Sequence, residues 1–263
     1  MTEAVAVPVT SLPGGVEMPM IGFGTWQLRG RAGRQAVLTA LRDGYRHIDT
    51  ATMYGNEAEV GHALAESGLD RRSVFLTTKL PSSRAGHEHG TLAASLRALG
   101  TDHVDLWLVH WPPSSGRQLC QVWREFLALR DEGKTRAIGV SNYSLAQIDR
   151  LTEATGVTPA VNQIAWSPAR HDPALLAGHR ERGVALEGYS PLKGANMADP
   201  VLDGIATAHG VTPAQVVLRW HLEHGITVIP KSSHPDRIAA NIDVLRFTLT
   251  PDQVAKIDAL SRR

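Results

Sequence analysis

Short apolar runs rich in Val, Ile and Leu alternate with amphipathic stretches along the whole chain. Runs of this length between turn signals are typical of buried strands. Eight are expected, at residues 20–24, 46–50, 74–79, 104–110, 136–141, 160–166, 185–189 and 226–230. The first seven begin about every 24 to 32 residues, the length of one βαβ unit. The last interval is longer and holds two helical stretches, 200–209 and 213–224.

The signals for helix ends agree with this alternation. A glycine ends a helix at low cost because it adopts the left-handed conformation. Such glycines follow the helical stretches at positions 44, 68, 100, 133, 156, 183, 210 and 225. Asp199-Pro200, Thr212-Pro213 and Thr250-Pro251 each pair an N-cap residue with proline at the first helical position. The intervals between strands are therefore predicted to be helices.

Eight strands alternating with eight or more helices predict an α/β fold of the (β/α)₈ TIM barrel class. The leading segment 7–20 contains Pro13-Gly14-Gly15 between two short apolar stretches, which predicts an N-terminal β-hairpin capping the bottom of the barrel. A final helix is expected at 251–260. Nothing resembling a linker or repeat interrupts the chain, so residues 1–263 are interpreted as a single domain.

Composition narrows the functional classes. The chain is 43% hydrophobic and 20% charged, with a net charge of +1, so neither nucleic acid nor a membrane surface is an expected partner. Cys120 is the only cysteine, which rules out an internal disulfide and favours a reducing compartment. The N-terminus lacks the pattern of a signal peptide, and no apolar stretch approaches the roughly 20 residues of a membrane span. A cytoplasmic monomer is expected.

Four reactive side chains stand where predicted strands end. Asp49 closes the second strand and Tyr54 follows it, Lys79 closes the third, and His110 closes the fourth. The carboxyl ends of barrel strands meet on one rim, where active sites lie. Each residue alone has an ordinary explanation, such as a turn cap for Asp49 or a core position for His110. Four on adjacent strands favour a catalytic site.

Their chemistry suits the protonation of a carbonyl. A tyrosine with its ordinary pKa of about 10 delivers a proton poorly near neutrality. A neighbouring Lys79 cation is expected to lower the pKa of Tyr54, and Asp49 is expected to keep that ammonium charged and in place. His110 can donate a hydrogen bond to the carbonyl oxygen. Such a site lacks only a source of hydride.

Several motif matches are discounted. Gly133-Lys134-Thr135 lacks the first glycine of a P-loop, GVSNY (139–143) lacks the last glycine of a nucleophile elbow, and GFGTWQ (22–27) lacks the third glycine of a dinucleotide fingerprint. His87 with His89, and His221 with His224, have spacings that a metal could use, but no carboxylate or thiol partners stand nearby at a recognised spacing. No metal is expected.

The chain resembles the aldo-keto reductase family along nearly its whole length. Eight blocks occur in that family's order: GFGTWQ (22–27), HIDTATMYGNE (47–57), TTKL (77–80), DLWLVHWP (105–112), GVSNY (139–143), VNQIAWSP (161–168), GYSPL (188–192) and IPKSS (229–233). Eight ordered blocks are far more specific than any single one. The resemblance implies that Tyr54 is the proton donor, supported by Asp49, Lys79 and His110. It also implies reduction of aldehydes and ketones to alcohols by hydride transfer.

The same resemblance implies a bound nicotinamide cofactor. Tyr189 would stack on the nicotinamide ring, and Ser141, Asn142 and Gln163 would bind its carboxamide. Gly24 and Thr25 would let the backbone approach the cofactor, and Ser190 and Leu192 begin the loop that covers the pyrophosphate in this family.

A basic cluster surrounds a helix start near Pro235 and consists of Lys231, Ser232, Ser233, Arg237 and Asn241. A helix N-terminus beside Lys and Arg suits a phosphate, which in this context indicates the adenosine 2′-phosphate and therefore NADP(H). Ala240 stands where many relatives have an acidic residue that contacts the adenine.

The sequence gives fewer indications of the residues that bind the substrate. Trp26 and Trp111 are expected at the rim beside Tyr54 and, with His110, to contact a small carbonyl substrate. The chain ends at Arg263 without the long C-terminal loop that sets specificity in many relatives. This short form resembles bacterial members, including those called 2,5-diketo-gluconate reductases.

Two other functions remain open at this point. One is a non-catalytic, nucleotide-binding regulatory subunit on the same fold, as in the potassium-channel β-subunits. The other is an unrelated barrel enzyme that holds the phosphate of a sugar with Lys231 and Arg237. Fold alone does not decide between these functions. The complete set of four reactive residues favours the enzyme.

Overall fold

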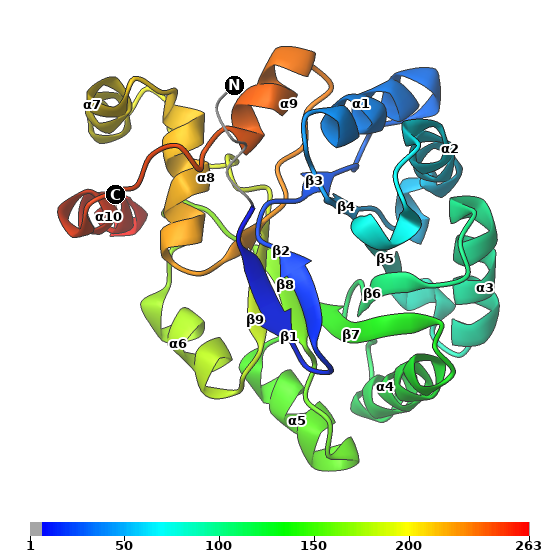
Figure 1. Cartoon of the computed structure of the whole chain (residues 1–263). Helices are drawn as coiled ribbons and strands as arrows, with labels where there is room; N and C mark the ends of the chain where they lie inside the picture. The colour runs from blue at the N-terminus through cyan, green and yellow to red at the C-terminus, as the bar shows by residue number, and fades with distance from the viewer. Residues whose placement is uncertain (1–6, 263) are drawn as a thin grey trace.

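The computed structural model describes residues 7–262 and contains one closed sheet of eight parallel strands (Figure 1). The strands are β3 (Phe23–Gly24), β4 (His47–Asp49), β5 (Phe75–Leu80), β6 (Val104–Val109), β7 (Thr135–Ser141), β8 (Val161–Ala165), β9 (Ala185–Tyr189) and β10 (Thr227–Val228). Each strand pairs with the next along the chain. A parallel bridge from Ile21 to Val228 closes the ring. All eight predicted strands are confirmed.

The first and last strands are shorter than predicted. The Val228 N–H donates to Met20 O, and the Gly22 N–H donates to Val228 O, so the two ends meet through a bridge rather than a long ladder. Pro230 has no N–H to extend the pairing, which explains why β10 stops early.

Helices form the outer layer. They are α1 (Gly30–Arg42), α2 (Glu57–Ser67), α3 (Glu88–Leu99), α4 (Gly116–Asp131), α5 (Leu145–Thr155), α6 (Pro173–Glu181), α7 (Pro200–His209), α8 (Pro213–Glu223), α9 (Pro235–Ile242) and α10 (Pro251–Asp258). The predicted pair of helices before the last strand is confirmed as α7 and α8. No helix in the described part of the chain is long and apolar enough to cross a lipid bilayer.

The predicted helix ends are also confirmed. All eight glycines proposed to end helices have positive φ. Asp199, Thr212 and Thr250 each accept a backbone N–H of the first helical turn with the side chain. These local signals fix where the chain leaves each helix to start the next strand.

The N-terminal hairpin consists of β1 (Val9–Leu12) and β2 (Val16–Pro19), paired antiparallel. Leu12, Val16 and Met18 pack on residues near the beginnings of the barrel strands, such as Phe75 and Ala160. The hairpin therefore covers the amino end of the barrel, as predicted, and leaves the carboxyl ends of the strands free to carry a site.

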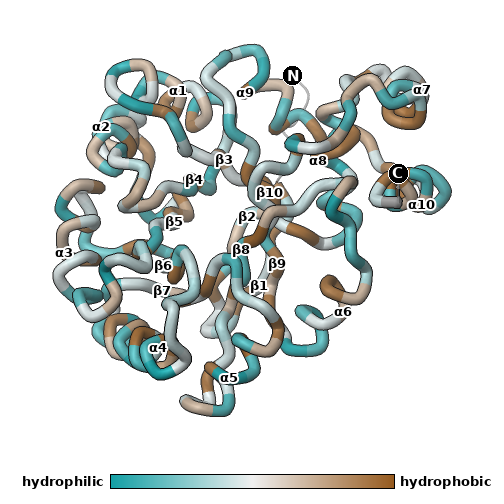
Figure 2. The backbone as a smooth tube through the Cα atoms, turned by 180° about the vertical axis from the view of Figure 1, so that it is seen from behind, coloured by the Kyte–Doolittle hydropathy of each residue, from teal (hydrophilic) through white to brown (hydrophobic). Residues whose placement is uncertain are grey.

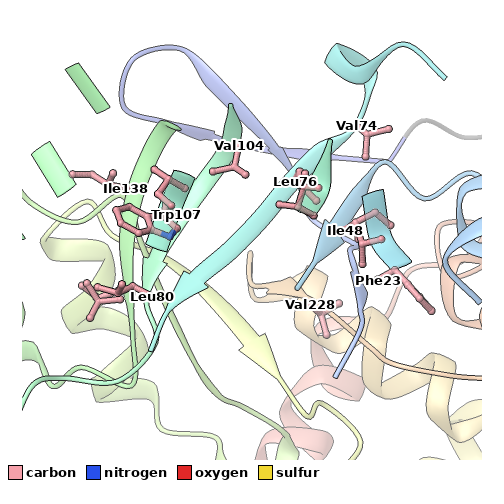
Figure 3. Packing of buried hydrophobic residues seen from close by; sticks show 14 of the residues in the cluster. Phe23, Ile48, Val74, Leu76, Leu80, Val104, Trp107, Ile138 and Val228 are labelled. Carbon is pink, nitrogen blue, oxygen red and sulfur yellow. The ribbon is translucent and has the colours of Figure 1, made fainter. Parts of the chain in front are cut away.

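Most of the core lies between the strands and the helices. Figure 3 shows Phe23, Ile48, Leu76 and Trp107 among the strands in this layer. Trp107 stacks on Phe126 of α4 with ring centroids 3.8 Å apart. Figure 2 shows hydrophobic and hydrophilic residues alternating along the helices that surround the strands. This packing holds the strand ends, and the side chains they carry, in fixed positions.

Candidate active site

The four reactive residues predicted from the strand ends lie together at the carboxyl end of the barrel. Asp49 is the last residue of β4, Lys79 lies near the end of β5, and His110 directly follows β6. Tyr54 ends a 3₁₀ turn, Thr52–Tyr54, that follows β4. Asp49 and Lys79 are fully buried, whereas Tyr54 and His110 are partly exposed.

Lys79 and Asp49 form a buried ion pair. The Lys79 Nζ lies 2.6 Å from both Asp49 carboxylate oxygens and 2.9 Å from Thr50 O. Burial alone would lower the pKa of Lys79, but the charge of Asp49, its hydrogen bond and the nearby Tyr54 and Glu187 together more than offset this and raise the pKa. Lys79 is therefore a cation at neutral pH, as its predicted role requires.

Tyr54 lies between this cation and His110. The Lys79 Nζ is 5.1 Å from the centroid of the Tyr54 ring. The Tyr54 and His110 rings meet edge to face at 5.7 Å. Burial raises the pKa of Tyr54, and Lys79 only partly opposes this. The prediction of a net lowered pKa is therefore wrong in sign, although the direction of the lysine's effect is right. Tyr54 stays protonated at neutral pH.

His110 is uncharged at neutral pH. Burial, and then the charge of Lys79, lower its pKa to about 3. Among residues 7–262 its Nδ1 has no hydrogen-bond partner. A neutral imidazole has one N–H donor. This state suits the predicted hydrogen bond to a carbonyl oxygen.

A second layer of buried polar groups, which the sequence did not reveal, lies beneath these residues. The Gln163 Nε2 donates to Asp49 Oδ2 and to Glu187 Oε2, both at 2.8 Å. Glu187 is fully buried in β9, and burial, with the nearby charge of Asp49, raises its pKa to about 8. His47 lies beyond it, with Nε2 3.6 Å from Glu187 Oε1. The signal in the sequence was a carboxylate inside the apolar run ALEGY.

The residues expected near the nicotinamide lie on neighbouring strand ends. The Tyr189 hydroxyl donates to Asn142 Oδ1 at 2.9 Å, and the Asn142 Nδ2 donates to His110 O at 3.2 Å. The Ser141 hydroxyl donates to Gln163 O. Asn142 and Ser190 have φ of 63° and 52°, a region that residues other than glycine rarely adopt. These strained positions cluster where a ligand is expected.

Gly24 is the last residue of β3, Thr25 follows it, and both are buried. A Cβ at Gly24 would lie 2.9 Å from Ile229 O, so the close approach at this position is to the backbone after β10. The Thr25 hydroxyl donates to Asp49 O at 2.9 Å. Both residues therefore support the rim on which Asp49 lies.

The basic cluster lies around the start of α9. Lys231, Ser233 and Arg237 are exposed, and Ser232 and Asn241 are buried. The Ser232 hydroxyl oxygen accepts the His234 N–H at 3.1 Å and shapes the turn into the helix. Two exposed cations, Lys231 and Arg237, thus stand near backbone N–H groups of a helix start.

Large apolar side chains are exposed around the mouth of the barrel. Trp26 is 53% exposed and Trp111 is 46% exposed, each two residues beyond a strand end. Met53, for which no role was predicted, is 58% exposed and directly precedes Tyr54. Side chains of this size on a soluble surface mark a binding surface more often than a random position.

Comparisons with known proteins agree with this geometry. A model of the "Aldo/keto reductase family" matches residues 20–262. The chain belongs to this family. It is 43% identical to a 2,5-diketo-D-gluconic acid reductase B of a Corynebacterium species, over 97% of the chain and 94% of that relative.

Two crystal structures of family members share the fold. An aldo/keto reductase of Brucella melitensis superposes with a TM-score of 0.96 at 42% identity, covering 98% of this chain and all of that chain. An aldo-keto reductase of Bombyx mori, solved in complex with NADP, superposes with a TM-score of 0.91 at 33% identity, covering 99% of this chain and 95% of that chain.

Proposed function

We propose that this aldo-keto reductase reduces aldehydes and ketones to alcohols with NADPH, and that Tyr54 donates the proton. The observation that carries the proposal is the juxtaposition at one rim of a lysine cation held by Asp49, the Tyr54 ring 5.1 Å from it, and the His110 ring against Tyr54. Family membership and the NADP complex of the Bombyx mori relative support the class of reaction.

Each of these residues has a distinct role in the proposed reaction. NADPH supplies the hydride when it is bound. Neutral His110 donates a hydrogen bond that orients the substrate carbonyl. Tyr54 releases its proton to the carbonyl oxygen as negative charge develops there. Lys79 stabilises the phenolate left behind, and Asp49 keeps Lys79 charged and fixed in position.

The chain has a suitable cradle for the nicotinamide end of NADPH. Tyr189 would stack on the ring, with its orientation held by the hydrogen bond to Asn142. Ser141, Asn142 and Gln163 would contact the carboxamide. Since the Gln163 amide nitrogen already serves Asp49 and Glu187, its carbonyl oxygen is the atom left for this contact.

The rest of the cofactor would follow the rim toward α9. The backbone at Gly24 and Thr25 and the strained turn at Ser190 and Leu192 would cover the pyrophosphate. The 2′-phosphate would bind the residues of the basic cluster, Lys231, Ser232, Ser233, Arg237 and Asn241. Two exposed cations beside a helix N-terminus suit this group better than the hydroxyl of NADH.

The substrate would enter between Trp26 and Trp111. Indole rings give an apolar, flat-walled mouth, and their N–H groups can orient a polar substituent. Such a mouth would accept a range of small or moderate carbonyl compounds. We also propose that the protein acts as a cytoplasmic monomer on a single folded domain, since one cysteine is typical of a reducing compartment and one closed barrel buries its own core.

Cofactor titration followed by a substrate panel tests the proposal. Addition of the protein should quench NADPH fluorescence, and simple aldehydes should then consume the bound NADPH. Quenching without consumption across aromatic, aliphatic and sugar-derived carbonyls would instead support a regulatory subunit. No quenching at all would contradict the proposed use of NADPH.

A further inference from the structure

A cluster of three potential metal ligands lies away from the proposed active site, on the outer layer of the barrel. His171 follows the short turn Pro168–Arg170 after β8, His224 caps the end of α8, and Asp258 is the last residue of α10. One ring nitrogen of each histidine and one carboxylate oxygen all lie within 4.8 Å of one another. Residues distant in the sequence thus meet at one point.

The spacing is close to that of a tetrahedral site. Zinc binds nitrogen and oxygen at about 2.0–2.2 Å, which places neighbouring ligand atoms about 3.3–3.6 Å apart. The His224 Nε2 and Asp258 Oδ1 are 2.8 Å apart, and the His171 Nε2 and the same oxygen are 3.7 Å apart. These two distances require side-chain movements of under 1 Å, and the ring nitrogens of His171 and His224, which lie within 4.8 Å of each other, would have to approach as well.

His171 is the observation that points to a ligand. Its side chain is only 7% exposed, yet within residues 7–262 the Nε2 that faces Asp258 has no hydrogen-bond partner, and neither has the Nδ1 on the other side of the ring. Its Nε2 is too far from Asp258 for a hydrogen bond. Buried polar groups are normally paired. The His171 ring instead faces the Asp258 carboxylate and the His224 ring without a hydrogen bond to either, which a bound metal ion would explain.

The surroundings hold the three groups in place. The Trp220 Nε1 donates to Asp258 Oδ1 at 2.7 Å, an outer-shell contact of the kind that orients metal-binding carboxylates. The His171 ring lies edge to face against Trp166 and Trp220. Asp258 and His224 retain some exposure, which leaves a path for an ion and for a water as fourth ligand.

The histidine pair discounted in the sequence is not the site. Both ring nitrogens of His221 face backbone oxygens, of Val217 and of Trp166. His224 instead faces His171 and Asp258, which lie 53 positions before it and 34 after it. Spacing along the chain therefore could not reveal the set.

We propose that His171, His224 and Asp258 bind one divalent transition-metal ion, with Zn²⁺ as the expected occupant. Two imidazoles and one carboxylate suit such an ion, whereas Mg²⁺ and Ca²⁺ prefer oxygen ligands alone. Because the ligands come from α8, α10 and the turn after β8, the ion would fasten the C-terminal helix to the barrel. Figure 1 shows α10 beside α8 near the C-terminus. The role is structural and separate from the proposed carbonyl chemistry.

Zn²⁺ calorimetry on the full-length, untagged protein after chelation and dialysis tests the proposal. The wild type should bind one Zn²⁺ per chain, and saturation should raise the melting temperature because the ion binds only the folded chain. His171→Gln and Asp258→Asn should each weaken binding roughly ten-fold or more and abolish the thermal shift. Co²⁺ should give a tetrahedral absorption band in the wild type that both variants lose.

His89→Gln is the matched control, since His89 forms an ordinary surface pair with Glu125. It should bind Zn²⁺ like the wild type. Two results would overturn the proposal: no stoichiometric binding by the wild type at micromolar Zn²⁺, or equal binding by a folded Asp258→Asn variant. The amide of that variant still accepts hydrogen bonds from Trp220 and His224, so a folding defect is not expected.

Discussion

Glu187 is the residue whose charge state bears most on the buried network. Burial raises its pKa to about 8, so it is mainly neutral at pH 7 and does not compete with Asp49 for Lys79. Above pH 8 its negative charge would further raise the pKa of Tyr54, which it already influences in that direction. A weaker acid donates its proton less readily.

Glu187→Gln should therefore retain most of the reductase activity at pH 7 and lose the part of the alkaline decline that begins near pH 8. The glutamine copies the neutral acid in shape. Rate constants for reduction measured from pH 6 to 9.5 would check this. A fall of more than ten-fold at pH 7 would mean that the site needs the carboxylate, and the neutral assignment would fail.

The rim residues could be predicted because each ends a strand, where side chains leave the core. Asp49, Lys79 and His110 follow apolar runs whose ends are clear in the sequence. Glu187 and His47 could not be predicted as parts of the site, because they lie within apolar runs and their hydrogen-bond and ion-pair partners come from other strands. The predicted shift in the pKa of Tyr54 was wrong in sign for a related reason. The sequence identifies the nearby cation but not how deeply the Tyr54 side chain is buried.

At the scale of elements, the start of α9 should decide which cofactor is preferred. Lys231→Ala with Arg237→Ala should weaken NADPH binding at least ten-fold, since each charged hydrogen bond contributes about 1.5–3 kcal/mol. NADH binding should change little. Fluorescence titrations with both cofactors measure this.

Arg246→Ala with Lys256→Ala is the control, because it removes the same charge from surface ion pairs elsewhere. Equal losses for NADPH and NADH in the α9 variant would show that Lys231 and Arg237 act structurally. Equal losses in the control would show an effect of net charge alone.

Helix packing depends on a close contact between α2 and α3. A Cβ at Gly61 would lie 2.7 Å from the carbonyl oxygens of Ala98 and Leu99. Overpacking costs about 1–3 kcal/mol, whereas alanine gains about 1 kcal/mol in helix propensity. Gly61→Ala should therefore lower the free energy of unfolding by up to about 2 kcal/mol in urea titrations.

Gly90, on the exposed face of α3, has nothing within 4 Å of its Cβ position. Gly90→Ala should raise the free energy of unfolding by about 0.5–1 kcal/mol. If both substitutions stabilise, the two helices can separate enough to admit a methyl group and the contact is not tight. The strands and the helix caps could be predicted from local sequence patterns. The contact between α2 and α3 could not, because it joins residues that are distant in the sequence.

At the scale of the whole molecule, buried neutral histidines should set the acid limit of stability. Burial lowers the pKa of His47 and of His221 to about 4, from an ordinary value near 6.5. Between pH 6.5 and 4 these two histidines are therefore protonated in the unfolded chain but not in the folded chain. The stability that is present above pH 6.5 is lost as pH falls toward 4. Each histidine contributes up to about 1.4 kcal/mol per pH unit.

Glu187 acts in the opposite direction. Its raised pKa gives stability that is full below pH 4.5 and is lost as pH rises through about 8, so it offsets part of the histidine effect. Urea unfolding at steps from pH 7 to 4.5 should show a fall in stability that is steeper in Glu187→Gln. A flat profile in both proteins would contradict the assignment of neutral, buried histidines.

The most direct test of the proposed chemistry is single-turnover reduction of an aldehyde by the NADPH complex of Tyr54→Phe. Loss of a general acid should slow hydride transfer by about 10² to 10⁴, while NADPH binding stays near normal. Tyr143→Phe is the control, because the Tyr143 hydroxyl is buried and has no hydrogen-bond partner among residues 7–262. It should react like the wild type. A Tyr54→Phe rate within a few-fold of the wild type would show that Tyr54 is not the proton donor.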